Sequence, residues 1–174
     1  MQITSPINFK QWIDEHRHLL KPPVGNQQIW TDGDFIVMVV GGPNSRKDFH
    51  YNEGPEFFYQ LQGDMLVKIM ENSLPKDVPI KEGEIFLLPP KVPHNPQRGA
   101  NTIGLVIENK RRPEDNDGLL WFCEKCHQPL YSEYFKLVDI VNQFQGVFAK
   151  YYGSLDLRTC KKCGAIMEPP AKPV

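Results

Sequence analysis

The sequence lacks any apolar run long enough to cross a bilayer, and it has no surplus of charge of one sign. Its longest apolar stretches are strand-length, far below the roughly 20 residues that a membrane-spanning helix needs. The 174 residues carry 20 lysines and arginines against 21 acids, so we expect no nucleic acid and no membrane partner. The N-terminal residues lack the basic-then-apolar order of a secretion signal. These absences predict a soluble, cytoplasmic protein.

Cysteine is scarce, and all 4 cysteines fall into two CxxC pairs, Cys123 with Cys126 and Cys160 with Cys163. This spacing predicts a tetrahedral four-thiolate metal site, similar to a rubredoxin-like or zinc-ribbon pair of knuckles, with Gly164 relieving one turn. Disulfides are the alternative, which a cytoplasmic setting disfavours. Spacing does not separate iron from zinc. Because a closed thiolate cage has no vacant position, we expect a role in structure, iron delivery or oligomer stability.

Long helical segments are also few, while 16 prolines and 13 glycines favour turns. Between Gln28 and Glu108, short β-branched and aromatic runs alternate with clusters of Gly, Pro, Asn and Asp. No helix-length segment separates these runs, so a parallel doubly wound sheet is disfavoured. The region therefore predicts a mainly β sandwich or small barrel.

One helix is expected before these strands and one after them. The apolar spacing of residues 8–20 predicts a helix capped by Asn8, with Gln11 in capping-box register. The histidines of that helix, His16 and His18, are expected to be packing or surface residues rather than metal ligands. A second apolar stripe, from Leu137 to Tyr151, predicts a helix packed on the barrel. The polar stretch around residue 113 predicts a division into a barrel with its N-terminal helix, residues 1–112, and a metal-binding extension, residues 113–174.

Two histidines and one acid in the strand region form a candidate metal centre. His50 and Glu56 are separated by five residues, and His94 follows in a later predicted strand. Two imidazoles and one carboxylate make the facial triad that holds iron(II) and leaves open coordination positions. Taken singly, each of these residues is as often structural as it is a ligand. Their combination predicts one ferrous site.

Further charged residues are predicted to face the same interior. Side chains two residues apart share one face of a strand, which groups Arg46 and Asp48 with His50, Arg98 with His94, and Glu108 with Val106. Buried charges without partners cost several kcal/mol each, so a site explains this polarity better than a core does. The alternative is that Arg46, Arg98 and Glu108 are surface residues at strand ends. Asp48 is expected to pair with an arginine.

These residues resemble the two sequence motifs of the cupin superfamily. The first motif is matched by His50, Asn52, Glu56 and Gly63, and the second by Gly83, Pro89, Lys91, His94 and Arg98. Asn52 stands where a second histidine is usual, which reduces four ligands to three, and Arg98 replaces an asparagine. The resemblance implies a cupin double-stranded β-helix, a jelly-roll barrel.

These two departures from the cupin motifs, together with five longer segments of the sequence, resemble the pattern of one family, the 3-hydroxyanthranilate 3,4-dioxygenases. The matching segments run nearly from end to end: LLKPPVGN (19–26), VVGGPNSRKDFH (39–50), EFFYQLQG (56–63), FLLPPKVPHNPQR (86–98) and LVIENKRRP (105–113). The resemblance implies that His50, Glu56 and His94 bind iron(II). It also implies that Arg46, Arg98 and Glu108 line the substrate pocket and that the protein is a homodimer.

The implied reaction is the opening of 3-hydroxyanthranilate by O2 to 2-amino-3-carboxymuconate semialdehyde. That product closes to quinolinate, on the kynurenine route from tryptophan to NAD. Arg98 is then expected to bind the substrate carboxylate. Glu108 would orient the substrate or act as acid–base catalyst, and Arg46 would stabilise bound oxygen or developing negative charge.

The segment of residues 21–26 has two interpretations. It is a lid over the pocket that brings Asn26 to the substrate and excludes water, or its prolines only end the first helix. Two alternative functions also remain open, a cupin dioxygenase acting on a thiol or diketone and a non-catalytic ligand-binding cupin. The pair of Arg98 and Glu108 favours an acidic aromatic substrate, and an intact ligand triad disfavours a pure binding module.

Overall fold

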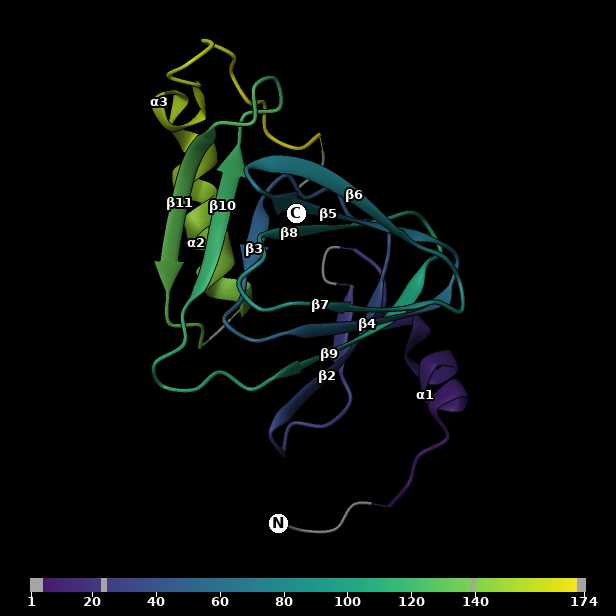
Figure 1. Cartoon of the computed structure of the whole chain (residues 1–174). Helices are drawn as coiled ribbons and strands as arrows, with labels where there is room; N and C mark the ends of the chain where they lie inside the picture. Colours follow the sequence, from purple (N-terminus) through teal and green to yellow (C-terminus); the bar gives the residue numbers. More distant parts are fainter. Residues whose placement is uncertain (1–4, 23–24, 139, 172–174) are drawn as a thin grey trace.

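The chain forms two antiparallel sheets that face each other (Figure 1). The computed structural model describes residues 5–22, 25–138 and 140–171. The five-stranded sheet has, in spatial order, β1 (Asn26–Gln28), β2 (Phe35–Gly41), β9 (Ile103–Asn109), β4 (Glu56–Gln62) and β7 (Ile85–Leu88). The six-stranded sheet has β11 (Pro129–Phe135), β10 (Asp117–Phe122), β3 (Phe49–Tyr51), β8 (His94–Arg98), β5 (Met65–Glu71) and β6 (Leu74–Ile80). This pairing of strands confirms the predicted mainly β jelly roll.

The barrel core lies between the two sheets because alternate residues of their strands point inward. On β5, Met65, Val67 and Ile69 are buried, and they pack against Phe58 of β4 and Val106 of β9. This period of two is the one expected of strands with one face on a core. The same alternation carries polar residues of β4, β8 and β9 into the interior, and these form the candidate site.

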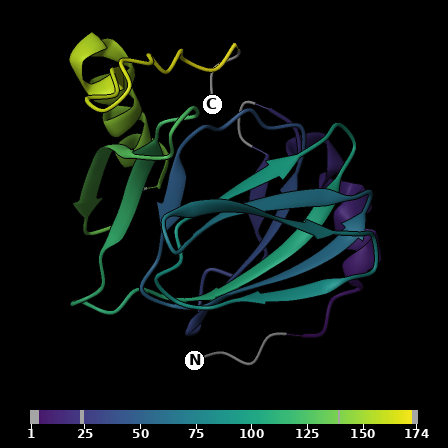
Figure 2. The same ribbon diagram turned by 45° about the horizontal axis from the view of Figure 1, so that its top comes forward.

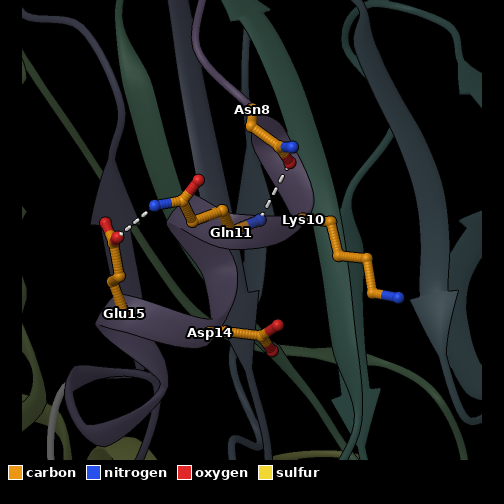
Figure 3. A pocket seen from close by; sticks show the side chains of 5 residues that line it. All are labelled: Asn8, Lys10, Gln11, Asp14 and Glu15. Carbon is orange, nitrogen blue, oxygen red and sulfur yellow. Dashed lines mark hydrogen bonds between the residues drawn. The ribbon is translucent and has the colours of Figure 1, made fainter.

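The N-terminal helix α1 (Phe9–His16) begins at the predicted cap and continues into the short 3₁₀ helix η1 (Arg17–Leu19). The side-chain oxygen of Asn8 accepts a hydrogen bond from the backbone N–H of Gln11 at 3.1 Å (Figure 3). The predicted capping box is not completed, because the Gln11 amide donates to Glu15 instead, at 2.8 Å. His16 stacks on Trp12, with ring centroids 4.1 Å apart, in agreement with a packing role.

The helix α1 covers one end of the outer face of the five-stranded sheet. Ile13 and Leu20 are buried there against Val39 of β2 and Ile103 of β9. In the part of the chain that the structure describes, no helix is long and apolar enough to span a bilayer.

The C-terminal part stands beside the barrel, with the hairpin β10–β11 backed by helix α2 (Ile140–Gly153) (Figures 1 and 2). A short helix α3 (Leu155–Arg158) follows. The predicted stripe indeed forms a helix, but its apolar residues pack mainly on the hairpin rather than on the barrel. Trp121 of β10 stacks on Tyr151 of α2 at 4.2 Å between centroids, in a cluster with Phe144, Val147 and Phe148.

The six-stranded sheet crosses the predicted boundary between residues 112 and 113. Leu119 of β10 lies opposite His50 of β3, and Gly118 lies opposite Tyr51. β10 is thereby a central strand, and its residues from Asp117 to Trp121 are all buried. The division into two domains stays a prediction, but the segment after residue 113 supplies an inner strand next to the candidate metal ligands.

Candidate metal centre and active site

Three predicted ligands converge inside the barrel from three strands. Glu56 Oε1 lies 3.5 Å from His50 Nδ1 and 3.2 Å from His94 Nε2. One ligand atom from each of the three residues lies within 4.8 Å of the others, and all three residues are buried. The register explains the convergence, because His50 of β3 is paired directly with His94 of β8 while Glu56 begins β4 in the opposite sheet.

Each histidine is oriented through its outer nitrogen. His50 Nε2 lies 2.8 Å from a carboxylate oxygen of Asp117, and His94 Nδ1 lies 3.0 Å from the carbonyl oxygen of Val92. An acceptor at the outer nitrogen holds the proton there and leaves the other ring nitrogen as a metal ligand. The free nitrogens, Nδ1 of His50 and Nε2 of His94, are the two that face Glu56.

The charged forms of His50 and Glu56 stabilise each other. Burial disfavours the imidazolium, but hydrogen bonds to the Asp117 and Glu56 carboxylates raise the pKa of His50 to about 9. Burial likewise opposes ionisation of Glu56, but His94 and His50 hold its pKa well below the usual value. The site is therefore electronegative enough to attract a cation, and a bound cation would take the place of the His50 proton.

The donor set suits a ferrous ion. Two imidazole nitrogens and one carboxylate oxygen, all buried and close together, are the facial arrangement that leaves coordination positions for other ligands. The residues present thus fit the metal that the sequence predicted.

Glu108 lies beside this centre. It is paired with Glu56 across β9 and β4, and Asn52 bridges the two acids, donating to Glu108 at 2.9 Å and to Glu56 at 3.4 Å. Arg111 also donates to Glu108. Burial and the nearby Glu56 raise the pKa of Glu108, while Arg111 opposes the rise. Asn52, which replaces the usual cupin histidine, therefore contacts the site through hydrogen bonds.

Arg46 and Asp48 form the arginine–aspartate pair that was expected. Asp48 is fully buried and accepts from Nε of Arg46 at 3.2 Å and also from Nη2. The Arg46 guanidinium lies over the ring of Phe144, 5.6 Å from its centroid, and that ring is also 5.8 Å from the His50 ring. Helix α2 therefore reaches the edge of the site.

Arg98 lies on the same strand and face as His94 and is almost entirely buried. Its Nη1 donates to the side-chain oxygen of Gln60 at 3.0 Å, and burial lowers the pKa of its guanidinium to about 10. Within the ranges that the structure describes, no carboxylate pairs with Arg98. A buried guanidinium without a counter-ion is a ready partner for an anionic ligand.

The sequence matches the family model for 3-hydroxyanthranilic acid dioxygenase over residues 1–152. The chain belongs to this family. Among its relatives, the 3-hydroxyanthranilate 3,4-dioxygenase of Xanthomonas euvesicatoria pv. vesicatoria is 56% identical over 96% of this chain and 94% of its own. The proteins of the same name from Ruegeria pomeroyi and Neurospora crassa are 51% and 43% identical, over 95% and 98% of this chain and 94% of each of theirs.

Membership of the 3-hydroxyanthranilic acid dioxygenase family confirms the resemblance, but the geometry does not test the roles predicted for Asn26 and for the segment of residues 21–26. Asn26 begins β1, and its side-chain amide lies 4.0 Å from the sulfur of Met38, with no contact to the three ligands among the described residues. The proposed lid, residues 21–26, includes Pro23 and Val24, which lie outside the described residues. Its role stays a prediction.

The four cysteines lie together in one group, as their spacing in the sequence predicted. Cys123 Sγ lies 3.6 Å from Cys163 Sγ, and Cys126 Sγ lies 3.5 Å from Cys160 Sγ. The two loops are built alike, because Cys123 and Cys160 each donate a backbone hydrogen bond five residues ahead and accept one from four residues ahead. Gly164 has a positive φ of 72°, and His127 takes the same conformation with a φ of 59°. His127 is thus a turn residue of the first loop.

Sequence reasoning missed Asp117 and Arg111. Both lie in the polar stretch that was interpreted as a boundary, and no strand periodicity connects them with His50. The available signal was the run from Asp117 to Phe122, whose apolar residues are typical of a buried central strand.

Proposed function

We propose that this protein is an iron(II)-dependent ring-cleaving dioxygenase that oxidises 3-hydroxyanthranilate with O2 to 2-amino-3-carboxymuconate semialdehyde. In this reaction the ring bond between C3 and C4 breaks and both oxygen atoms enter the product. The observation that carries the proposal is the buried group of two imidazoles and one carboxylate. The buried Arg98 lies on the same strand face as His94, and no carboxylate among the described residues pairs with it. The family relatives bear the name of this activity.

His50, Glu56 and His94 would hold the iron. When bound, the metal supplies a centre at which the hydroxyl and amino groups of the substrate chelate and dioxygen is activated. The protein residues bind, orient and protect the reacting groups. Because these residues are buried, water is kept away from the aromatic ring of the bound substrate.

We assign the remaining polar residues by their surroundings. Arg98 binds the substrate carboxylate, because a buried guanidinium is stabilised when an anion pairs with it. Glu108 orients the substrate or exchanges a proton with it, which agrees with the raised pKa of this buried acid. Arg46 stabilises negative charge that develops on oxygen. Asn26, at the start of β1, is proposed to contact the substrate.

The cellular setting follows from the same proposal. The product closes to quinolinate, which places the reaction on the route from tryptophan to NAD, and we expect the enzyme in the cytoplasm. The four-cysteine site is proposed to hold iron or zinc in a structural role. These assignments rest on the family and on the donor sets.

We further propose a homodimer. Support comes from the outer face of the edge strand β7, where Ile85 and Leu87 are 66% and 62% exposed beside Phe57 and Ile107 of neighbouring strands. An exposed apolar patch of this kind indicates an interaction surface. Sedimentation velocity should give a dimer for the wild type and a monomer for Leu87→Glu. A wild-type monomer would remove the proposal.

The activity is tested with anaerobic protein loaded with iron(II), given 3-hydroxyanthranilate and then air. We expect a transient near-ultraviolet absorbance together with the uptake of one O2 per substrate. The matched control is His94→Ala, which should lose both signals. Oxygen uptake only with a thiol or a diketone would favour another cupin dioxygenase, and no uptake with any of these would favour a non-catalytic cupin.

A further inference from the structure

A buried acid, Asp117, and an arginine, Arg111, contact residues of the candidate metal site from the chain segment that follows β9. Asp117 is fully buried at the start of β10, and Arg111 precedes it in the connection from β9. We propose that Asp117 and Arg111 are positioning residues for the metal site, Asp117 fixing the ring of His50 and Arg111 fixing both Asp117 and Glu108. This inference rests on the proposed function and identifies two further residues that serve it.

Asp117 contacts the side chain of one proposed metal ligand, His50. Its carboxylate oxygen lies 2.8 Å from Nε2 of His50, the nitrogen that faces away from Glu56. An anionic acceptor there keeps the proton on Nε2, directs the lone pair of Nδ1 toward the ligand cluster and makes that nitrogen a stronger donor.

Arg111 uses its guanidinium for two acids at once. Nε lies 3.0 Å and Nη2 2.7 Å from the two oxygens of Asp117, a bidentate contact, while Nη1 donates to Glu108. The side chains of Arg111, Asp117 and Glu108 are only 12%, 0% and 7% exposed. The orientation of a metal ligand and the position of a substrate-facing acid are therefore set by the same planar group.

The chain offers a matched comparison in the next pair along. Arg112 and Asp115 form a similar contact, with Nη2 2.8 Å from the carboxylate, but the Arg112 side chain is 66% exposed. Among the contacts of the described residues, none joins this pair to His50, Glu56 or His94. The two pairs have the same chemistry and lie within one short segment. They differ in burial and in whether their carboxylate contacts His50.

The test measures metal binding apart from turnover. Protein carrying zinc at the four-cysteine site is titrated anaerobically with iron(II) by calorimetry, without substrate. We expect Asp117→Asn to bind iron(II) roughly 10–100-fold more weakly, the range found when such outer partners are removed. Asp115→Asn should match the wild type. Asp117→Glu, which keeps the charge, should recover part of the affinity.

Steady-state kinetics at saturating iron(II) test Arg111. We expect Arg111→Lys to lower kcat and raise KM, because a single ammonium replaces a fork that held both acids, while Arg112→Lys changes neither. Normal iron(II) affinity in folded Asp117→Asn, or normal kinetics in Arg111→Lys, would overturn the inference. If Asp117→Asn does not fold, the iron(II) affinities of Asp117→Glu and Arg111→Lys are compared with that of the wild type. Weaker binding supports the inference, and wild-type binding by both variants contradicts it.

Iron(II) binding and ring opening are measured separately. A wild type that binds iron(II) at the triad but never opens 3-hydroxyanthranilate would remove the proposed function. Weakened iron(II) binding by Asp117→Asn in that same protein would still support the assignment of Asp117.

Discussion

Arg98 owes its place in the interior to the absence of a side chain opposite it. A Cβ built on Gly104 of β9 would lie 2.7 Å from Nη1 of Arg98 and 2.7 Å from the Gln60 oxygen. Both contacts are with the ends of flexible side chains, so an added methyl group would move these groups rather than the backbone. Gly104 thus makes room for the proposed substrate-binding guanidinium.

We therefore predict that Gly104→Ala gives a folded enzyme with a raised KM for 3-hydroxyanthranilate. Displacing a charge-assisted contact to a carboxylate costs about 1.5–3 kcal/mol, which corresponds to roughly 10–100-fold in kcat/KM. Steady-state kinetics at saturating iron(II) measure the change. The control is Gly146→Ala in α2, where an added Cβ meets nothing within 4 Å. An unchanged KM in Gly104→Ala would contradict the role given to Arg98.

At this scale the sequence predicted the residues that strand alternation and motif spacing can group. His50, Glu56 and His94 come together as expected, and Asp48 pairs with Arg46 as expected. Asp117 was missed because its contact with His50 depends on the pairing of β10 with β3, and pairing between distant strands leaves no periodic mark in a single sequence.

Among the elements, α2 is fastened to the hairpin by packing and by one ion pair. Lys150 of α2 lies 2.8 Å from Glu133 of β11, and Tyr131 also donates to that carboxylate. These two hydrogen bonds lower the pKa of Glu133 below its usual value of 4.5. A carboxyl whose pKa is lower in the folded state stabilises the fold above its unfolded pKa, and this contribution is lost as the pH falls through the folded value.

We predict that Glu133→Gln lowers the unfolding free energy by about 0.5 kcal/mol near neutral pH, the size of a partly exposed ion pair. The difference between wild type and variant should shrink as the pH falls below 4.5. Thermal unfolding followed by circular dichroism over a pH series measures it. In a Lys150→Gln background the effect of Glu133→Gln should be smaller. A difference independent of pH would count against the ion pair.

The helices and strands themselves were largely predictable, because amphipathic spacing and turn residues mark them locally. The boundary after residue 112 was interpreted from a polar, turn-rich stretch, and the sheet nevertheless continues beyond it through β10. The apolar stripe of α2 indicated a helix, but not which surface it covers. That surface is set by Trp121 and the other large rings of the hairpin.

At the scale of the whole molecule, the four-cysteine group joins the end of the chain to the hairpin. Cys123 and Cys126 follow β10, whereas Cys160 and Cys163 come after α2 and α3. A metal held by all four therefore closes a large loop around the cluster that supports β10. Structural metal sites of this kind contribute directly to folding.

We predict that Cys163→Ser, which removes one thiolate, lowers the unfolding free energy by about 4 kcal/mol and the melting temperature by roughly 10 °C. Scanning calorimetry with metal analysis measures both. The control is Lys162→Ser, which changes the neighbouring exposed residue. Full metal content and an unchanged melting temperature in Cys163→Ser would show that this thiolate is not a ligand.

The place of β10 in the sheet also sets an order of events during synthesis. The three proposed iron ligands precede Asp117 in the sequence, so they leave the ribosome first. A nascent chain that ends after β8 therefore contains His50, Glu56 and His94 but lacks the carboxylate that contacts His50. With Asp117 positioning His50 as proposed, the metal site is complete only once β10 has paired with β3.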